Sequence, residues 1–246
     1  MPVNAEPIRL AMWSGPRNIS TALMRSWGNR SDTIVVDEPL YAHFLLVTGD
    51  NHPAREEVIA SQPTDWRTVV AELTGPIPGG KRIYYQKHMT HHLLPQIDRQ
   101  WLAQVTSAFL IRHPRDVLTS YVRIRERPTL ADTGFTQQLE IFEWVRRQQR
   151  AAPIIVDAVD VLNEPRRTLG LLCEALGIPF EESMLSWSSG SRSTDGVWAP
   201  YWYREVVNST GFRPYQPKGE PVPDDLADIY RQCLECYEQL HEHRLR

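Results

Sequence analysis

The stretch that decides the fold is IRLAMWSGPRNISTALMRSW, residues 8–27. Its apolar start, residues 8–13, predicts a buried strand that ends at a Ser-Gly-Pro-Arg turn. The apolar residues Ile19, Leu23 and Trp27 then recur every fourth position, which predicts a helix with one apolar face. A strand, a tight turn and a helix form the usual frame of a phosphate-binding loop. This stretch nevertheless lacks the Gly-Lys-Ser/Thr of a nucleotide-binding loop.

Strands and helices alternate along the rest of the chain. The patterns predict strands at 33–39, 81–88, 104–114 and 154–156, and helices at 65–73, 114–125, 135–150, 165–177 and 224–241. This alternation predicts an α/β fold with three αβα layers and a central parallel sheet, formed by residues 1–246 as a single domain. In such folds ligands bind at the carboxyl ends of the strands.

Composition narrows the classes of partner. The net charge is −3, which gives no general attraction to nucleic acid or anionic membranes, so anion binding must come from a local site. No apolar run reaches the ~18 residues of a membrane span, and the N-terminus lacks a signal-peptide pattern. Three cysteines do not make a disulfide framework. We therefore expect a cytoplasmic protein without a nucleic-acid or membrane partner; its oligomeric state is not readable from the sequence.

The segment PRNIST, residues 16–21, lies where the first helix begins. The first N–H groups of a helix have no partner within it, and its dipole adds partial positive charge. Arg17 adds a full charge, while Ser20 and Thr21 add hydroxyl groups. These residues predict an anion site. The alternative is that the hydroxyl groups only cap the helix and that Arg17 is exposed to solvent. The near-match GPIPGGKR, residues 75–82, is interpreted as a turn because it leads into a strand.

A second stretch, RHPRDVLTS at residues 112–120, repeats this architecture. Arg112 ends a predicted strand and Ser120 lies two turns into the next helix, so both can meet one anion. Together, PRNIST and RHPRDVLTS resemble the two donor-binding signatures of the sulfotransferase family. YYQKHMTHHLLPQI and VDVLNEPRRTLGLLCEALGIPFEE resemble further segments of that family, so the resemblance covers about residues 8–182.

The resemblance implies a P-loop-like fold and 3′-phosphoadenosine 5′-phosphosulfate (PAPS) as sulfuryl donor. It implies that Arg17, Asn18, Ser20 and Thr21 hold the 5′-phosphosulfate and that Arg112 and Ser120 hold the 3′-phosphate. Arg17 would also act at the bridging oxygen. The family often has Gly where this chain has Ile19, and a side chain there disfavours positive φ and a close approach of the backbone to phosphate.

The acceptor requires a base, and two candidates remain. Glu38 in DEPLY follows the second predicted strand, near the first loop in the expected fold, and His88 in QKHM lies near the position of the histidine that cytosolic family members use. Burial would have to raise the pKa of a glutamate for work at neutral pH. Alternatively, His88, His91 and His92 form only a surface cluster; a metal site is disfavoured, and we expect no metal.

The acceptor is expected to be a small molecule with a hydroxyl or an amine. Residues 39–80 and 186–222 are expected to form its pocket, and 198–219 to contact adenine. Two other functions stay open: a P-loop kinase or nucleotide hydrolase, which would need a lysine in the first loop, and a non-catalytic, nucleotide-binding member of the sulfotransferase family.

Overall fold

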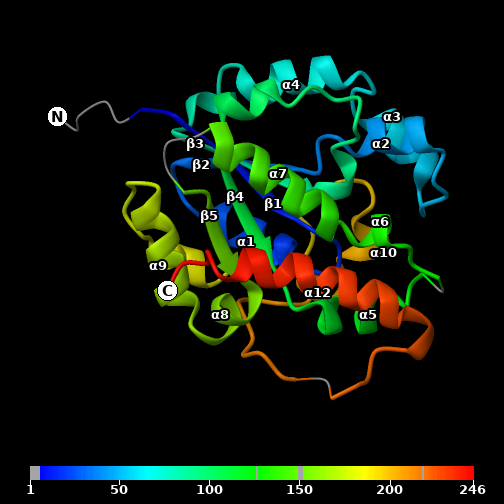
Figure 1. The fold of residues 1–246 in the computed structure, drawn as a ribbon. Coiled ribbons are helices and arrows are strands. Elements are labelled where there is room, and N and C mark those ends of the chain that lie inside the picture. The colour runs from blue at the N-terminus through cyan, green and yellow to red at the C-terminus, as the bar shows by residue number, and fades with distance from the viewer. Residues whose placement is uncertain (1–5, 126, 149–151, 218) are drawn as a thin grey trace.

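A computed structural model describes residues 6–125, 127–148, 152–217 and 219–246. At its centre is a five-stranded sheet in the order β2-β3-β1-β4-β5, and every pairing is parallel (Figure 1). The strands are β1 (Ile8–Ser14), β2 (Thr33–Asp37), β3 (Ile83–Met89), β4 (Thr106–Ile111) and β5 (Ile154–Asp157). The five predicted strands are therefore confirmed, with ends that differ by a few residues.

The central strand β1 sets the position of the site. Ser14 at its end pairs with Met89 of β3 on one side and with Leu110 of β4 on the other. The three strands therefore end almost level, and the loops that follow them meet at one edge of the sheet.

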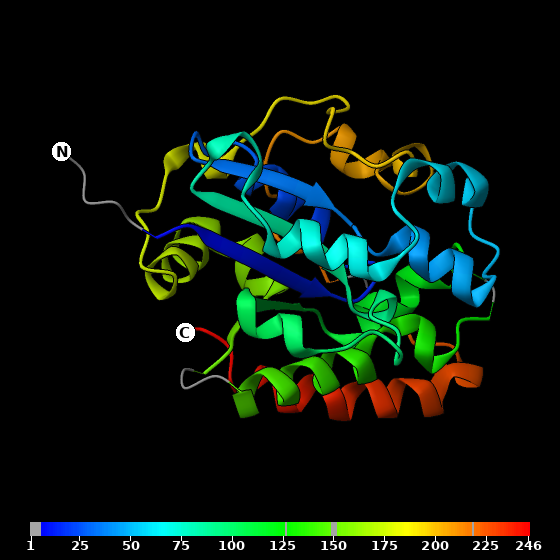
Figure 2. The same cartoon turned by 90° about the horizontal axis from the view of Figure 1, so that it is seen from above.

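Helices cover both faces of the sheet because the strand residues alternate in direction. Leu10 and Met12 of β1 pack with α1 (Ser20–Trp27), α8 (Ala158–Asn163) and α9 (Pro165–Ala175). Ala11 and Trp13 belong to the opposite core. Its helices are α4 (Trp66–Thr74), α7 (Phe135–Gln148) and α12 (Ala227–His241). Figure 2 shows α7 and α12 running side by side under the sheet. The predicted three-layer αβα fold is confirmed; residues 149 and 150, which were expected to extend α7, lie outside the described residues.

A third apolar cluster lies beyond the carboxyl edge of the sheet. It joins α2 (Tyr41–Thr48) and α3 (Arg55–Ser61) to α10 (Ala199–Trp202) and to Tyr203, which precedes α11 (Arg204–Val207). The sequence did not predict α2, because its residues YAHFLLVT have no polar face and so no helical period. Segment 186–222, predicted as irregular, contains α10 and α11 as its two short helices.

The remaining helices are short. They are α5 (Pro114–Tyr121) and α6 (Leu130–Thr133), and the 3₁₀ turns at Pro78–Gly80, Thr90–His92, Gln100–Gln104, Glu182–Leu185 and Asp224–Leu226. GPIPGGKR indeed leads through a 3₁₀ turn into β3, as its interpretation as a turn requires. Within the described part of the chain, no helix is both long enough and apolar enough to cross a membrane.

Candidate functional site

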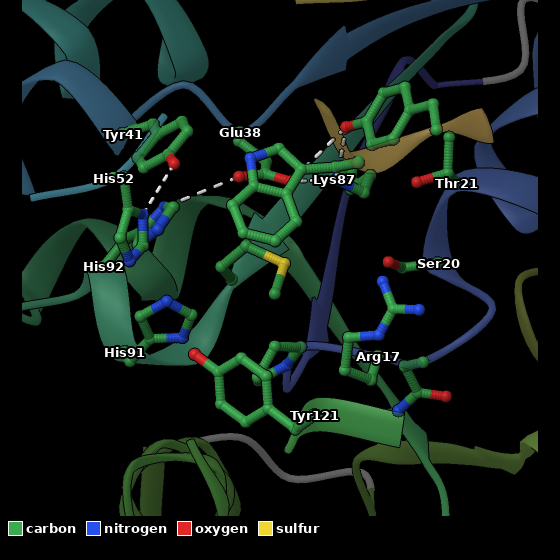
Figure 3. A pocket seen from close by; sticks show the side chains of 15 residues that line it. Arg17, Ser20, Thr21, Glu38, Tyr41, His52, Lys87, His91, His92 and Tyr121 are labelled. Carbon is green, nitrogen blue, oxygen red and sulfur yellow. Dashed lines mark hydrogen bonds and ion pairs between the residues drawn. The ribbon is translucent and has the colours of Figure 1, made fainter. Parts of the chain in front are cut away.

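A pocket lies at the carboxyl edge of the sheet, between the loop after β1 and the helices that cap this edge (Figure 3). Arg17, Asn18, Ser20 and Thr21 form one wall, and Glu38 stands on the opposite one. Five residues predicted from the sequence for the site therefore line a single pocket. Arg112 and Ser120 do not line the pocket, but each forms a hydrogen bond with Arg17, which does.

The loop after β1 is strained at Arg17 rather than at Ile19. Arg17 has φ +56°, in the left-handed region that costs a non-glycine residue about 1–2 kcal/mol. Ile19 has φ −89° and packs its side chain against the core beside α1. The expected conflict at Ile19 is therefore absent, because the backbone makes its left-handed step two residues earlier.

Asn18 fastens this loop to the neighbouring strand. Its Nδ2 donates to the carbonyl of Leu110 at 3.1 Å, and its Oδ1 accepts from the N–H of Ile19 at 3.1 Å. Both ends of the amide are thus engaged inside the protein. This pair of contacts suits the residue type at position 18, because an amide carries both a donor and an acceptor.

The two sequence motifs meet at Arg17. Its Nε donates to Oγ of Ser120 at 3.0 Å, and Nη1 of Arg112 donates to the Arg17 carbonyl at 2.9 Å. Burial lowers the pKa of Arg17; Glu205 opposes this effect and Arg112 adds to it, yet a guanidinium stays charged at neutral pH. Among the described residues, no carboxylate lies within 4.0 Å of Arg17. A half-buried cation without a counter-ion is suited to bind an anion.

The N-terminus of α1 adds further donors to the same wall. The residue before the helix, Ile19, makes no side-chain cap, so within the described part of the chain no side chain satisfies the N–H groups of the first turn. Ser20, which is buried, and Thr21 present hydroxyl groups there. These donors and the helix dipole favour a negative group in front of α1.

The opposite wall carries a buried ion-pair network. Glu38, with φ +42°, follows β2, and its Oε1 accepts a short hydrogen bond from Nζ of Lys87 on β3. Nζ of Lys87 also donates to Asp37 at 2.9 Å and to the hydroxyl of Tyr203 at 3.0 Å. Burial raises the pKa of Glu38, and Lys87 only partly offsets it. Burial alone would lower the pKa of Lys87, but Asp37 and Glu38 outweigh it and raise that pKa.

Tyr203 forms a close hydrogen bond with only one of the two carboxylates. Its hydroxyl has a single proton, which goes to Asp37 at 2.7 Å, whereas Oε1 of Glu38 is 3.4 Å away. Asp37 also accepts from the backbone N–H of Gly196 at 3.2 Å. Asp37 therefore accepts from three donors, while Glu38 has one strong partner and lines the pocket.

His88, the other predicted base, lies away from the pocket. Because β3 residues alternate in direction, its ring points into the core and stacks on Trp13, with ring centroids 4.3 Å apart. Its Nε2 lies 3.3 Å from the Gln86 side chain, and burial lowers the pKa of His88 to about 3. This placement corrects the prediction that His88 reaches the acceptor.

Histidines form the far end of the pocket, and the alternative that they form a surface cluster is wrong. His91 and His92, from the 3₁₀ turn after β3, are buried, and His52 joins them from the segment before α3. Burial lowers the pKa of His91 to about 3 and that of His92 well below its ordinary value, so both rings are neutral at pH 7. The sequence did contain a signal for this placement: His91 and His92 directly follow a predicted strand, and ligand sites in such folds lie at the carboxyl ends of strands. No group of three or more metal-binding side chains occurs among the described residues.

A family model described as a sulfotransferase domain matches residues 8–243. Two curated relatives from Arabidopsis thaliana are named branched-chain-amino-acid aminotransferase-like proteins 1 and 2. The chain is 36% and 35% identical to them over 97% and 94% of its own length, but it spans only 42% and 41% of theirs.

Two solved structures share the fold. A sulfotransferase domain from the curacin biosynthetic pathway superposes with a TM-score of 0.55 at 17% identity, covering 97% of this chain and 99% of that one. A sulfotransferase from Alicyclobacillus acidocaldarius gives 0.54 at 15% identity, covering 98% of both chains. At such identities the likeness concerns the fold alone.

Proposed function

Because this chain belongs to the sulfotransferase family, we propose that it transfers the sulfuryl group of PAPS to a small-molecule acceptor. One observation carries the proposal: Arg17, Ser120 and Arg112, from two distant motifs, converge beside the uncapped N-terminus of α1. This convergence supports an anion site, and Glu38 lines the same pocket.

The donor's charged groups fit the wall formed by the first loop. Arg17, together with Ser20 and Thr21 at the start of α1, would hold the 5′-phosphosulfate, and Arg112 with Ser120 would hold the 3′-phosphate. Arg17 already bonds Ser120; Arg112 already bonds a backbone carbonyl and forms an ion pair with Asp116 at 3.6 Å. Both guanidinium groups keep further N–H donors for the donor's oxygens. Asn18 would support the site by holding the loop, since its amide is already engaged.

Glu38 is proposed as the base. The acceptor oxygen attacks sulfur, the bond from sulfur to the bridging oxygen breaks, and the acceptor proton passes to Glu38. Charge then develops on the leaving bisphosphate, where Arg17 stabilises it. When Glu38 takes the proton, Lys87 remains paired with Asp37, so the buried network becomes neutral overall. Burial and the raised pKa of Glu38 favour this proton uptake.

The substitution Arg112→Ala tests the proposal. It should abolish binding of 3′-phosphoadenosine 5′-phosphate (PAP), measured by calorimetry, because the 3′-phosphate loses its charged partner. Arg146→Ala, an exposed change of the same type on α7, is the matched control and should bind normally. Unchanged affinity in Arg112→Ala would refute the assignment.

Thermal stabilisation by different ligands, together with a turnover assay, separates the rival functions. A P-loop kinase or hydrolase would be stabilised against heat by ATP with Mg²⁺ more than by PAP. The absence of a lysine from the first loop speaks against this. A non-catalytic member of the family would bind PAP but would not turn over PAPS with any acceptor. The curated relatives are named aminotransferase-like and are longer than this chain, so the non-catalytic function stays as an alternative.

A further inference from the structure

Aromatic rings cover both faces of His92. Its ring lies between Tyr41 on one face, with centroids 4.6 Å apart at 10°, and Phe44 on the other, 4.7 Å apart at 28°. The residue is 2% exposed. With both faces covered, only the edge of the imidazole is available for a polar contact.

That edge faces the proposed base. Nδ1 of His92 lies 4.0 Å from Oε2 of Glu38, and Figure 3 draws this contact. Among the described residues, Nδ1 has no hydrogen-bond partner although it is fully buried. The hydroxyl of Tyr41, which stacks on this ring, is bonded to His52 instead, at 2.7 Å. A buried polar atom without a partner costs free energy, so its position in a pocket points to a ligand.

The tautomer of His92 follows from its surroundings. A carboxylate opposite Nδ1 attracts an N–H dipole and repels a lone pair, so it favours the ring with the proton on Nδ1. An acceptor oxygen placed to the side of the 4.0 Å line from Nδ1 to Oε2 can reach both groups: its proton points to Glu38, and it accepts from Nδ1–H of His92.

We infer that Glu38 and His92 together select a hydroxyl acceptor over an amine. A hydroxyl oxygen has one proton for Glu38 and two lone pairs, one for His92 and one to attack sulfur. A neutral amine has a single lone pair, which cannot both accept from His92 and attack, and an ammonium has none. The inference rests on the proposed function and narrows it to transfer to oxygen. The bond formed is sulfur to acceptor oxygen, the bond broken is sulfur to the bridging oxygen of PAPS, and the proton ends on Glu38.

The first test does not need turnover. In protein labelled with ¹⁵N-histidine, two-bond spectra distinguish the tautomers, and His92→Phe assigns the His92 signal. We expect a neutral ring with the proton on Nδ1 at pH 7. A ring with the proton on Nε2 would overturn the inference, because that tautomer would accept a proton from an amine.

The second test compares 2-naphthol with 2-naphthylamine, which have the same shape and are both uncharged at pH 7, using labelled PAPS. Naphthol should be the better acceptor. His92→Phe, which keeps the aromatic stack, should lower its turnover on the order of 10-fold to 100-fold. His92→Asn, whose amide N–H can replace Nδ1–H, should restore part of it. PAP affinity should stay unchanged in both variants, because His92 lies at the far end of the pocket from the proposed anion site. His92→Phe should also keep the melting temperature, because it keeps the aromatic stack, whereas His92→Asn loses that stack and should melt at a lower temperature.

The outcomes separate the two proposals. Equal or faster transfer to naphthylamine, or full activity of His92→Phe, overturns the selection by His92 while the proposed function stands. A protein that binds no PAP, or that binds it and sulfates neither compound, contradicts the proposed function. The tautomer measurement would still decide the state of His92.

Discussion

Two residues of the pocket hold unusual backbone conformations. Arg17 and Glu38 have positive φ, and the third such non-glycine residue among those described is Ala54, before α3. Each conformation costs of order 1–2 kcal/mol and persists only where its surroundings impose it. In both cases the strain directs a charged side chain into the same pocket from a loop that follows a strand. Strain at this pair therefore supports their assignment to the site.

Replacing Glu38 with Gln tests the base at the residue scale. The amide cannot accept the acceptor's proton, so kcat should fall by about 10²–10⁴-fold. PAP affinity should be unchanged, because Glu38 stands on the wall opposite the anion site. Steady-state kinetics with labelled PAPS and calorimetry measure the two quantities.

The matched control for Glu38→Gln is His88→Phe. The phenyl ring can keep the stack on Trp13, and His88 does not line the pocket, so kcat should remain near that of the wild type. A large loss of kcat in His88→Phe together with full activity in Glu38→Gln would reverse the assignment.

Among the elements, the loop between β1 and α1 is the one proposed to bind the donor. Sequence reasoning located this loop and the helix that follows it, because the apolar strand and the four-residue spacing are local signals. It could not find the contact of Asn18 with Leu110, since β4 is about ninety residues away along the chain. It also missed α2, whose residues are apolar on all sides and so give no helical period.

Asn18→Ala should weaken both the loop and the binding of the donor. It removes two hydrogen bonds worth about 0.5–1.5 kcal/mol each, so the free energy of unfolding should fall by about 1–3 kcal/mol. PAP affinity should fall with it, because Arg17 is no longer held in its strained conformation. Urea unfolding and calorimetry measure these changes.

The control for this variant is Asn208→Ala. The Asn208 amide also donates to a backbone carbonyl, that of Arg204, but the residue is exposed and lies outside the pocket lining. We expect little change in either quantity. Equal effects in the two variants would show that Asn18 has no special role in the loop.

At the scale of the whole molecule, buried neutral histidines make stability depend on pH. Burial lowers the pKa of His88 and of His91 to about 3, and that of His92 well below its ordinary value. Below about pH 6.5 the unfolded chain binds these protons and the folded chain does not. Stability should therefore fall as the pH falls, by up to about 1.4 kcal/mol per pH unit for each histidine. Glu38 and Asp157, whose pKa burial raises, act in the opposite direction.

Urea unfolding at about pH 7.5 and pH 5.5 measures this dependence. His88→Phe should flatten the profile by the share of one histidine, since a phenyl ring does not titrate, and the difference between the two proteins isolates that share. Parallel profiles would mean that His88 is not buried as a neutral ring.

Sequence alone determined the αβα fold and located the two motifs proposed to bind the donor's anionic groups, because alternating strands and helices, helix starts and short spacings are local properties. It also proposed Glu38 as the base, but could not choose between Glu38 and His88. Only the tertiary structure places Glu38 in the pocket and His88 outside it: the direction of a side chain on β3 and the pairing of Lys87 with Asp37 depend on strands distant in sequence. The same holds for His92, whose neighbours Tyr41 and Phe44 come from α2, a helix without a local signal. The burial and orientation of a side chain arise from packing, and packing depends on contacts between segments that are distant in the sequence.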